Sequence, residues 1–183
     1  MMRIFLFMAM IVTGWPLPGF GEQTPNVMVT LSAVRIVNNA HGKESLLPGE
    51  RANPGDSIEY RATYKNIGTA PAQKLTGTLP VPAEMEYVPS SAHPSAVMAS
   101  TDNTVYSKTP LKRKVKLANG TLVNREVPVE EYRSLRWLLH DLAPGASVTV
   151  SARMKIKDNQ KGPVVIKLDS ISPTEKRASG GTK

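Results

Sequence analysis

The feature that most constrains this chain is the strict alternation of apolar and polar residues in its two clearest segments. Apolar side chains occupy alternate positions in residues 56–66, and again in residues 147–157. A period of two sends neighbouring side chains to opposite faces of a strand, whereas a helix would scatter these apolar residues around its circumference. Each segment therefore predicts a half-buried antiparallel strand with one packed face and one solvent-exposed face.

Shorter alternations predict further strands. One begins at Val27, and the shift of its apolar phase to Val34 and Ile36 suggests a β-bulge or a strand that changes sheet. Other short strands are expected at residues 75–79, 85–87 and 164–168. Many short strands joined by turns favour an all-β sandwich or barrel.

Turn residues separate the predicted strands. Pro54-Gly55 and Pro144-Gly145 each precede one of the two clear strands. This dipeptide is typical of a type II turn, because proline pre-sets φ at the first central position and glycine accepts a positive φ at the second. Asn119-Gly120 predicts a two-residue type I′ hairpin that would pair Leu117 with Leu122.

Residues 129–142 leave two interpretations open. As a helix, they would align Val129 and Tyr132 with later apolar residues on one stripe. As a strand, they would turn Leu135 and Trp137 toward the core. Periodicity alone does not decide between these two structures.

The first 21 residues have the layout of a secretory signal peptide. Arg3 supplies a positive charge, and Ile4–Val12 form an unbroken apolar run. Gly19 and Gly21 are small residues just before a candidate cleavage site at Glu22. The apolar run is much shorter than the ~20 residues that span a bilayer. We expect an exported protein, periplasmic or extracellular, whose mature chain has no transmembrane span; a buried N-terminal helix or an uncleaved anchor is the alternative.

Composition is compatible with one folded domain. Apolar residues make up 40% of the 183 residues, enough for a core, and the absence of cysteine excludes disulfides and thiol nucleophiles. Arg3 is the only charged residue among the first 21, so the remaining chain keeps 22 of the 23 basic residues and all 15 acidic ones, a formal charge of +7. We expect a signal peptide at 1–21, one sandwich at 22–172 and a disordered polar tail at 173–183.

Several stretches of the chain are similar to an uncharacterised bacterial repeat domain, the domain of unknown function numbered eleven. They are NPGDSIEY (53–60), YKNIGTAPA (64–72), LTGTLP (75–80), MEYVPSSA (85–92), LRW (135–137) and LAPGASV (142–148). The resemblance covers roughly residues 27–168, with an insertion-like middle at 94–129.

This resemblance implies an immunoglobulin-like sandwich of secreted or surface proteins, often found in adhesin-like stalks. It favours a strand at 135–139, with Trp137 as the large core residue between the sheets. Asn66 before Gly68 is typical of a strand end, where Asn can bond its own backbone and Gly can take a left-handed conformation. Where the family often has Asp, this chain has Gly77, so no cation or hydrogen-bond role of that Asp is carried over. Only one copy is present, which does not build a long stalk.

Patterns of catalytic or metal-binding residues are missing from the sequence. The three histidines, His41, His93 and His140, lie far apart, and none has a second ligand at metal-binding spacing. His140 is followed by Asp141, but no nucleophile motif such as G-x-S-x-G accompanies this pair. We therefore expect a protein that is not an enzyme and needs no cofactor or metal.

Seven basic residues are candidates for an anion-binding face: Lys112, Arg113, Lys114, Lys116, Arg153, Lys155 and Lys157. The first four belong to one arm of the Asn-Gly hairpin, with Lys114 and Lys116 sharing its solvent face, and the last three line the outward face of another strand. If these strands are neighbours, they form a continuous cationic face for anionic glycans or lipid head groups. The alternative is that lysine on an edge strand only prevents edge-to-edge aggregation, or only keeps the protein soluble.

The sequence thus favours a non-catalytic, exported interaction or structural module of the bacterial envelope or cell surface. Its expected partner is an envelope or surface protein. The alternative function is binding of an anionic glycan or lipid through the basic hairpin. Nucleic acid is not expected as a partner, because export separates the protein from cellular nucleic acid and because aromatic residues for base stacking are few.

Overall fold

The computed structural model describes residues 26–38, 43–49, 51–166 and 168. The predicted signal peptide at 1–21 and the predicted tail at 173–183 lie outside these residues. Within them, every regular element is a β-strand except one turn of 3-10 helix, η1 (Val129–Glu131). The predicted all-β class is therefore confirmed. The described part of the chain has no helix long and apolar enough to cross a membrane.

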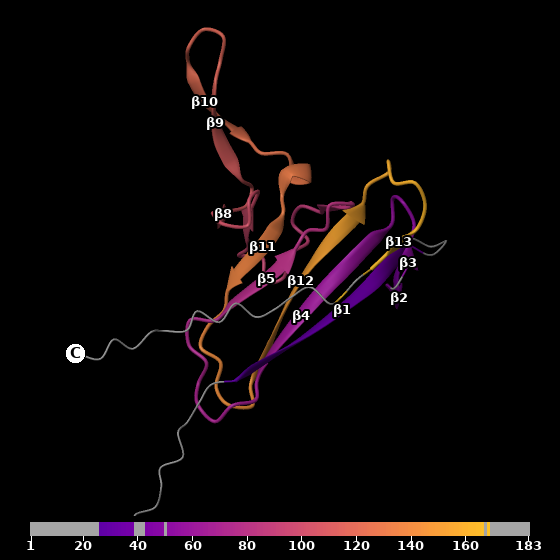
Figure 1. Ribbon diagram of the computed structural model, residues 1–183, viewed down its shortest axis with the longest axis vertical. Coiled ribbons are helices and arrows are strands. Elements are labelled where there is room, and N and C mark those ends of the chain that lie inside the picture. Colours follow the sequence, from indigo (N-terminus) through magenta and orange to yellow (C-terminus); the bar gives the residue numbers. More distant parts are fainter. Residues whose placement is uncertain (1–25, 39–42, 50, 167, 169–183) are drawn as a thin grey trace, which may run out of the picture.

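The larger sheet is antiparallel and has the strand order β2-β1-β4-β12-β6 (Figure 1). Its strands are β1 (Val27–Asn38), β2 (Glu44–Pro48), β4 (Ser57–Asn66), β6 (Met85–Tyr87) and β12 (Ser147–Ile156). The two strands predicted from strict alternation are confirmed as β4 and β12. They pair directly with each other from Ser147↔Lys65 to Lys155↔Ser57, at the centre of the sheet.

The second sheet has the order β5-β11-β7-β8. Its strands are β5 (Thr76–Pro80), β7 (Met98–Ser100), β8 (Ser107–Lys108) and β11 (Ser134–Leu138). The helical interpretation of residues 129–142 is wrong, since only η1 coils and β11 follows it. The strand is preferred because Leu135 and Trp137 are then both buried and the Trp137 Nε1–H donates to the carbonyl of Pro94 at 2.7 Å.

The inner faces of the two sheets form one core, as in a β-sandwich. The apolar side of β4, which includes Ile58 and Tyr64, is buried, as are Leu135 and Trp137 of β11. Gly77 of β5 pairs with Trp137, and a Cβ atom at Gly77 would lie only 3.2 Å from the Tyr64 ring. The close approach of β4 to β5 therefore favours glycine at this position, because a Cβ atom would have to push the Tyr64 ring aside.

The predicted bulge in β1 is wrong. β1 pairs with β4 in one continuous register, from Val27↔Asn66 to Ile36↔Ser57. β1 does not change sheet either. Its apolar phase shifts within one continuous strand, since Val34 and Ile36 lie opposite Glu59 and Ser57 of β4. Val34 and Ile36 lie on the outer face of the sheet and are partly covered there.

Both Pro-Gly turns have the predicted geometry. Gly55 and Gly145 have φ of 87° and 78°. Each turn is closed by a backbone hydrogen bond of 3.0 Å. In the first turn the Asp56 N–H donates to the carbonyl of Asn53, and in the second the Ala146 N–H donates to the carbonyl of Ala143. These are the positive φ and the closing bond of a type II turn.

Asn66 joins the ends of three segments. Its side chain is fully buried, and Nδ2 donates to the carbonyls of Ala70 and Leu142, each at 2.8 Å. Its Oδ1 accepts from the N–H of Gly68 at 3.0 Å, which confirms the predicted local backbone contact. The predicted left-handed conformation of Gly68 is wrong, because its φ is not positive. The Asn66 side chain already fixes this turn by hydrogen bonds.

Two small sheets complete the described structure. β3 (Arg51–Ala52) pairs with β13 (Val164–Val165), which is shorter than the strand predicted at 164–168. β9 (Lys112–Lys116) and β10 (Leu122–Glu126) form a separate hairpin that belongs to neither large sheet.

Candidate functional site

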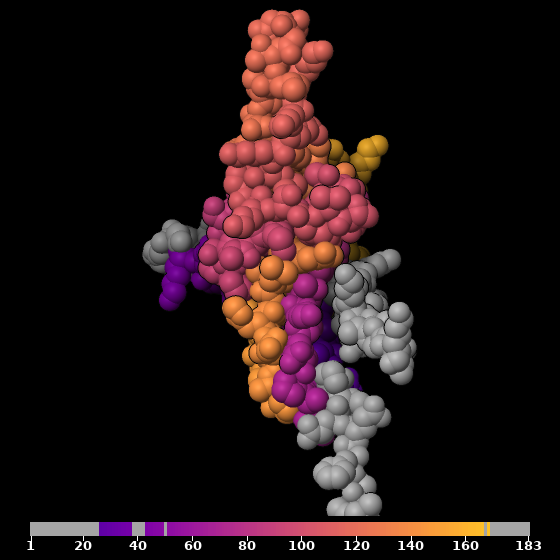
Figure 2. Space-filling model, turned by 90° about the vertical axis from the view of Figure 1, so that its left-hand side faces the viewer, coloured from indigo at the N-terminus to yellow at the C-terminus, as the bar shows by residue number. Residues whose placement is uncertain are grey.

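The β9–β10 hairpin projects from one end of the molecule. In Figure 1 it extends beyond the sheets, and the perpendicular view in Figure 2 shows it surrounded by open space on the visible sides. At its base, the Val127 N–H donates to the carbonyl of Leu111 at 2.9 Å, and both residues are buried in the core. The hairpin is therefore anchored at its base and exposed along its length.

The turn of this hairpin differs from the sequence prediction. Leu122 pairs with Lys116, and Leu117 meets Thr121 through an N–H to carbonyl bond of 2.9 Å. The φ of Gly120 is 84°, whereas that of Asn119 is not positive, so a type I′ turn and a Leu117–Leu122 pair are wrong. A left-handed glycine at the end of a longer loop is typical of a turn followed by a G1 bulge.

This register places three lysines on one face of the hairpin. Lys112, Lys114 and Lys116 alternate with Arg113 and Val115, so they point to the same side of β9. None of the three makes a hydrogen bond or an ion pair within the described residues. The predicted shared face of Lys114 and Lys116 is confirmed. We call these three lysines the hairpin lysines.

Arg113 points to the other face and has a different role. Its two terminal nitrogens donate to both carboxylate oxygens of Glu131, at 2.7 and 2.8 Å. This bidentate pair raises the pKa of Arg113 and lowers the pKa of Glu131. Because Glu131 belongs to η1, the pair holds the base of the hairpin against the body.

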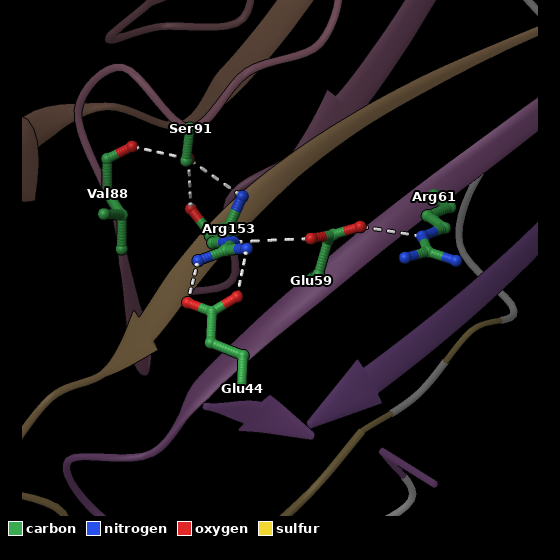
Figure 3. Close-up of polar contacts among 6 residues, drawn as sticks. All are labelled: Glu44, Glu59, Arg61, Val88, Ser91 and Arg153. Carbon is green, nitrogen blue, oxygen red and sulfur yellow. Dashed lines mark hydrogen bonds and ion pairs between the residues drawn. The ribbon is translucent and has the colours of Figure 1, made fainter. Parts of the chain in front are cut away.

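The basic residues of β12 are already engaged in contacts, as Figure 3 shows for Arg153. Its terminal nitrogens donate to the Glu44 carboxylate at 2.7 and 2.8 Å, and its Nε donates to Glu59 at 3.3 Å. The hydrogen bonds from Arg153 lower the pKa of Glu44. Lys155 pairs with Asp158 at 2.8 Å.

Lys157 likewise has a partner, since its Nζ donates to the carbonyl of Ala83 at 2.7 Å. The two groups of basic residues are also not neighbours: β9 pairs only with β10, and β12 pairs with β4 and β6. The condition for one continuous cationic face is therefore not met. Of the seven sequence candidates, the hairpin lysines are the ones whose charges are unpaired within the described residues.

A cavity of about 470 Å³, which sequence patterns did not predict, lies between β6 and the segment that carries the hairpin. Tyr87 and Tyr132 line it as a stacked pair with ring centroids 6.1 Å apart. They are far apart in the chain, so no local motif marks them. The Tyr132 hydroxyl already accepts from the N–H of Leu111 at 2.9 Å, and Thr109 Oγ1 donates to the carbonyl of Val97 at 3.3 Å. These polar groups are satisfied internally and do not define a ligand.

Comparison with family models, with curated proteins and with solved structures gives no significant match. Among the described residues, no group of three His, Cys, Asp or Glu side chains could hold a metal ion. His93 and His140 are both exposed, and His41 lies outside the described residues. The projecting hairpin is therefore the candidate site that geometry selects.

Proposed function

We propose that this protein is a non-catalytic, exported interaction module of the bacterial envelope or cell surface, which contacts its partner through the β9–β10 hairpin. The observation that carries the proposal is the projection of this hairpin from the body with three unpaired lysines on one face. An element that adds little to the core but extends into solvent is well placed to meet another molecule.

The strand order supports an immunoglobulin-like topology. In such domains one sheet has the order A-B-E-D. The order β1-β4-β12-β6 matches this sheet if β1, β4, β6 and β12 are taken as strands A, B, D and E, with β5 as strand C. The second sheet differs, because β11, the neighbour of β5, precedes β12 in the chain, whereas strand F follows strand E. Domains of this architecture commonly serve as scaffolds for loops and hairpins that bind partners. The layout of residues 1–21 supports export.

The charge of the hairpin supports an anionic partner surface, and an anionic glycan or lipid head group is the alternative to a protein. Alternate residues of a strand are about 6.6 Å apart, so the hairpin lysines form a row that can meet several negative charges at once. Leu122, which is 63% exposed, lies beside Lys116 near the tip and adds an apolar contact. The hairpin lysines have no ion-pair partner within the described residues, so binding breaks no ion pair there.

Charge reversal tests this function. We expect Lys112→Glu, Lys114→Glu and Lys116→Glu together to abolish retention on heparin-like resin and on vesicles that contain anionic lipid. The matched control is Lys65→Glu, Lys74→Glu and Lys161→Glu, which changes the net charge equally at exposed positions elsewhere. Loss of retention in the hairpin variant alone supports a specific contact, whereas equal retention in both variants contradicts it. Retention on heparin without vesicles, or the reverse, distinguishes the glycan from the lipid.

Export has a separate test. Fractionation of the producing cells, followed by determination of the N-terminal residue, should recover a chain that begins near Glu22 outside the cytoplasm. In-place cross-linking of that chain identifies the partner. Recovery of the intact N-terminus in the cytoplasm contradicts export, whatever the hairpin binds.

A further inference from the structure

The edges of the sheets differ in how well they are protected. Edge strands present unpaired backbone groups, and natural proteins block them with proline, charge, shortness or a cover. On β5, the Thr78 N–H donates to the Tyr64 hydroxyl at 3.0 Å, and Pro80 ends the strand. β6 and β8 are very short, β2 ends at Pro48, and the hairpin strands are rich in charge. Each of these edges has a protective device.

The first half of β1 is the exception among the described residues. β2 pairs only with residues 34–38, and Gly49, which follows it, packs against the main chain of Ala33. Within the described residues, Val27–Ser32 therefore have a strand partner on the β4 side alone, and β2 flanks the opposite end of β1, near β3 and β13 (Figure 1). The segment reads VMVTLS, without charge, proline, glycine or bulge. Its inward side chains are only half-buried, and the outward Met28 is 46% exposed. This edge has the properties of a strand that pairs with another chain.

We propose that this edge pairs, antiparallel, with the same edge of a second copy of the protein. The segment is complementary to itself: with Thr30 at the two-fold axis, Met28 of one copy lies opposite Ser32 of the other, and Val29 lies opposite Leu31. Antiparallel pairing of this kind keeps inward residues opposite inward residues, so the half-buried apolar stripes of the two copies become continuous. Two-fold, isologous contacts of this type are the commonest in homodimers.

The geometry of β2 sets the length of the pairing. Pro48 of β2 already occupies the position opposite Val34. Gly49 packs against the main chain of Ala33. A partner strand therefore fits along Val27–Ser32 and must leave the sheet at Ala33. An interface of one short strand pair is small, which predicts a weak dimer whose population depends on concentration.

Charge does not forbid this contact. The nearest basic residues on the outer face are Lys65 and Arg61, which lie on β4 opposite Met28 and Ser32. In the dimer the two β4 strands are separated by three strand spacings, about 14 Å. This exceeds the Debye length of about 8 Å at physiological ionic strength, so repulsion between the copies is largely screened.

Two variants at the two-fold axis test the proposal. The chain contains no cysteine, so Thr30→Cys introduces a single thiol. In the proposed register the two Cα atoms are about 4.5–5.5 Å apart, which lies within the range of a disulfide. We expect mild oxidation to link Thr30→Cys into a dimer, while Thr101→Cys, on an exposed bend near the other sheet, stays monomeric. Equal cross-linking of both variants, or none of Thr30→Cys, overturns the register.

Thr30→Lys places two like charges opposite each other at the same axis. Light scattering over a dilution series should show a monomer–dimer equilibrium for the unmodified protein and for Thr101→Lys, and a monomer for Thr30→Lys. The proposal is overturned if the unmodified protein stays monomeric over the whole dilution series, or if the Thr30→Lys variant still dimerises. The circular dichroism spectrum of Thr30→Lys shows whether this variant is folded. If it is not, cross-linking of Thr30→Cys still tests the dimer. Neither result depends on the hairpin lysines, so the two proposals fail separately.

Discussion

At the scale of single residues, Gly77 shows how closely the two sheets approach. A Cβ atom at this position would meet Tyr64 at 3.2 Å and Leu139 at 3.3 Å, both in the core. An aspartate at this position would add a carboxylate to the same contact, so the Tyr64 and Leu139 side chains would have to shift further.

We expect Gly77→Ala to lower the free energy of unfolding by about 1–3 kcal/mol through overpacking. Gly77→Asp should cost more, because it also buries a charge without a partner. Urea denaturation measures both, with Thr76→Ala, a half-exposed neighbour on β5, as the control. If Gly77→Asp is as stable as the unmodified protein, the close packing described here is wrong.

Tyr60 gives the fold an alkaline limit. Burial, and secondly the negative charge of Glu84, raises its pKa from 10 to about 12. A raised pKa means that the folded state holds the phenol proton more tightly than the unfolded state does. The resulting stabilisation is complete below pH 10 and is lost as the pH rises toward 12, by roughly 2–3 kcal/mol.

The Tyr60→Phe variant should therefore lose less stability than the unmodified protein when the pH is raised from about 8 to about 11.5. These two pH values lie on either side of about 10, the usual pKa of tyrosine. Guanidinium denaturation at these pH values measures the difference. Some alkaline loss should remain in the variant, since burial also raises the pKa of Tyr64 and Tyr87. Parallel curves for the two proteins would show that Tyr60 is not the responsible group.

Some residues could be predicted and others could not. Trp137 and Asn66 were recognisable from the sequence, because a lone large aromatic in a strand and an Asn at a strand end have few alternatives. The contact between Arg153 and Glu44 was not, because the two residues are 109 positions apart. Charge alone made Arg153 a candidate for binding, whereas its ion pairs make it part of the sheet.

At the scale of elements, alternation predicted β4 and β12 almost to the residue, since both are half-buried strands with one clean face. The same rule misread β1, where Val34 and Ile36 lie on the outer face of one continuous strand. The hairpin turn was misread for another reason: the dipeptide Asn119-Gly120 indicates a turn but does not fix the loop length. The extra loop residue decides which strand positions pair.

Excision of the hairpin tests its independence from the fold. Replacing residues 112–126 with a short Gly/Asn linker joins Leu111 to Val127, whose backbone groups already meet at 2.9 Å. We expect the free energy of unfolding to change by less than about 1 kcal/mol, because β9 and β10 pair with no other strand. Retention on an anionic surface should be lost. A collapse of the denaturation midpoint would show that the hairpin belongs to the core.

At the scale of the whole molecule, the sequence indicated two packed sheets but not which strands lie side by side. The sheet order decides the charge distribution, because β9 and β12 belong to different sheets and their basic residues never merge into one face. Periodicity is a local property, whereas strand neighbours depend on the path of the whole chain. The separation of the hairpin from both sheets was therefore beyond prediction from the pattern alone.

The two proposed contacts respond oppositely to salt. Added salt screens the attraction between the hairpin lysines and an anionic surface, so retention should fall as ionic strength rises. Each copy carries a formal charge of +8, or +7 without residues 1–21, so two copies repel each other at long range. Added salt screens this repulsion, and pairing through β1 should therefore increase.

The shape of the hairpin also determines how near the rest of the molecule can come to whatever its tip touches. Strands of five residues extend about 17 Å. A surface that contacts only Leu122 and Lys116 at the tip would therefore lie about 17 Å from the body. A surface that also contacts Lys112 would lie along the side of the hairpin, close to the sheets.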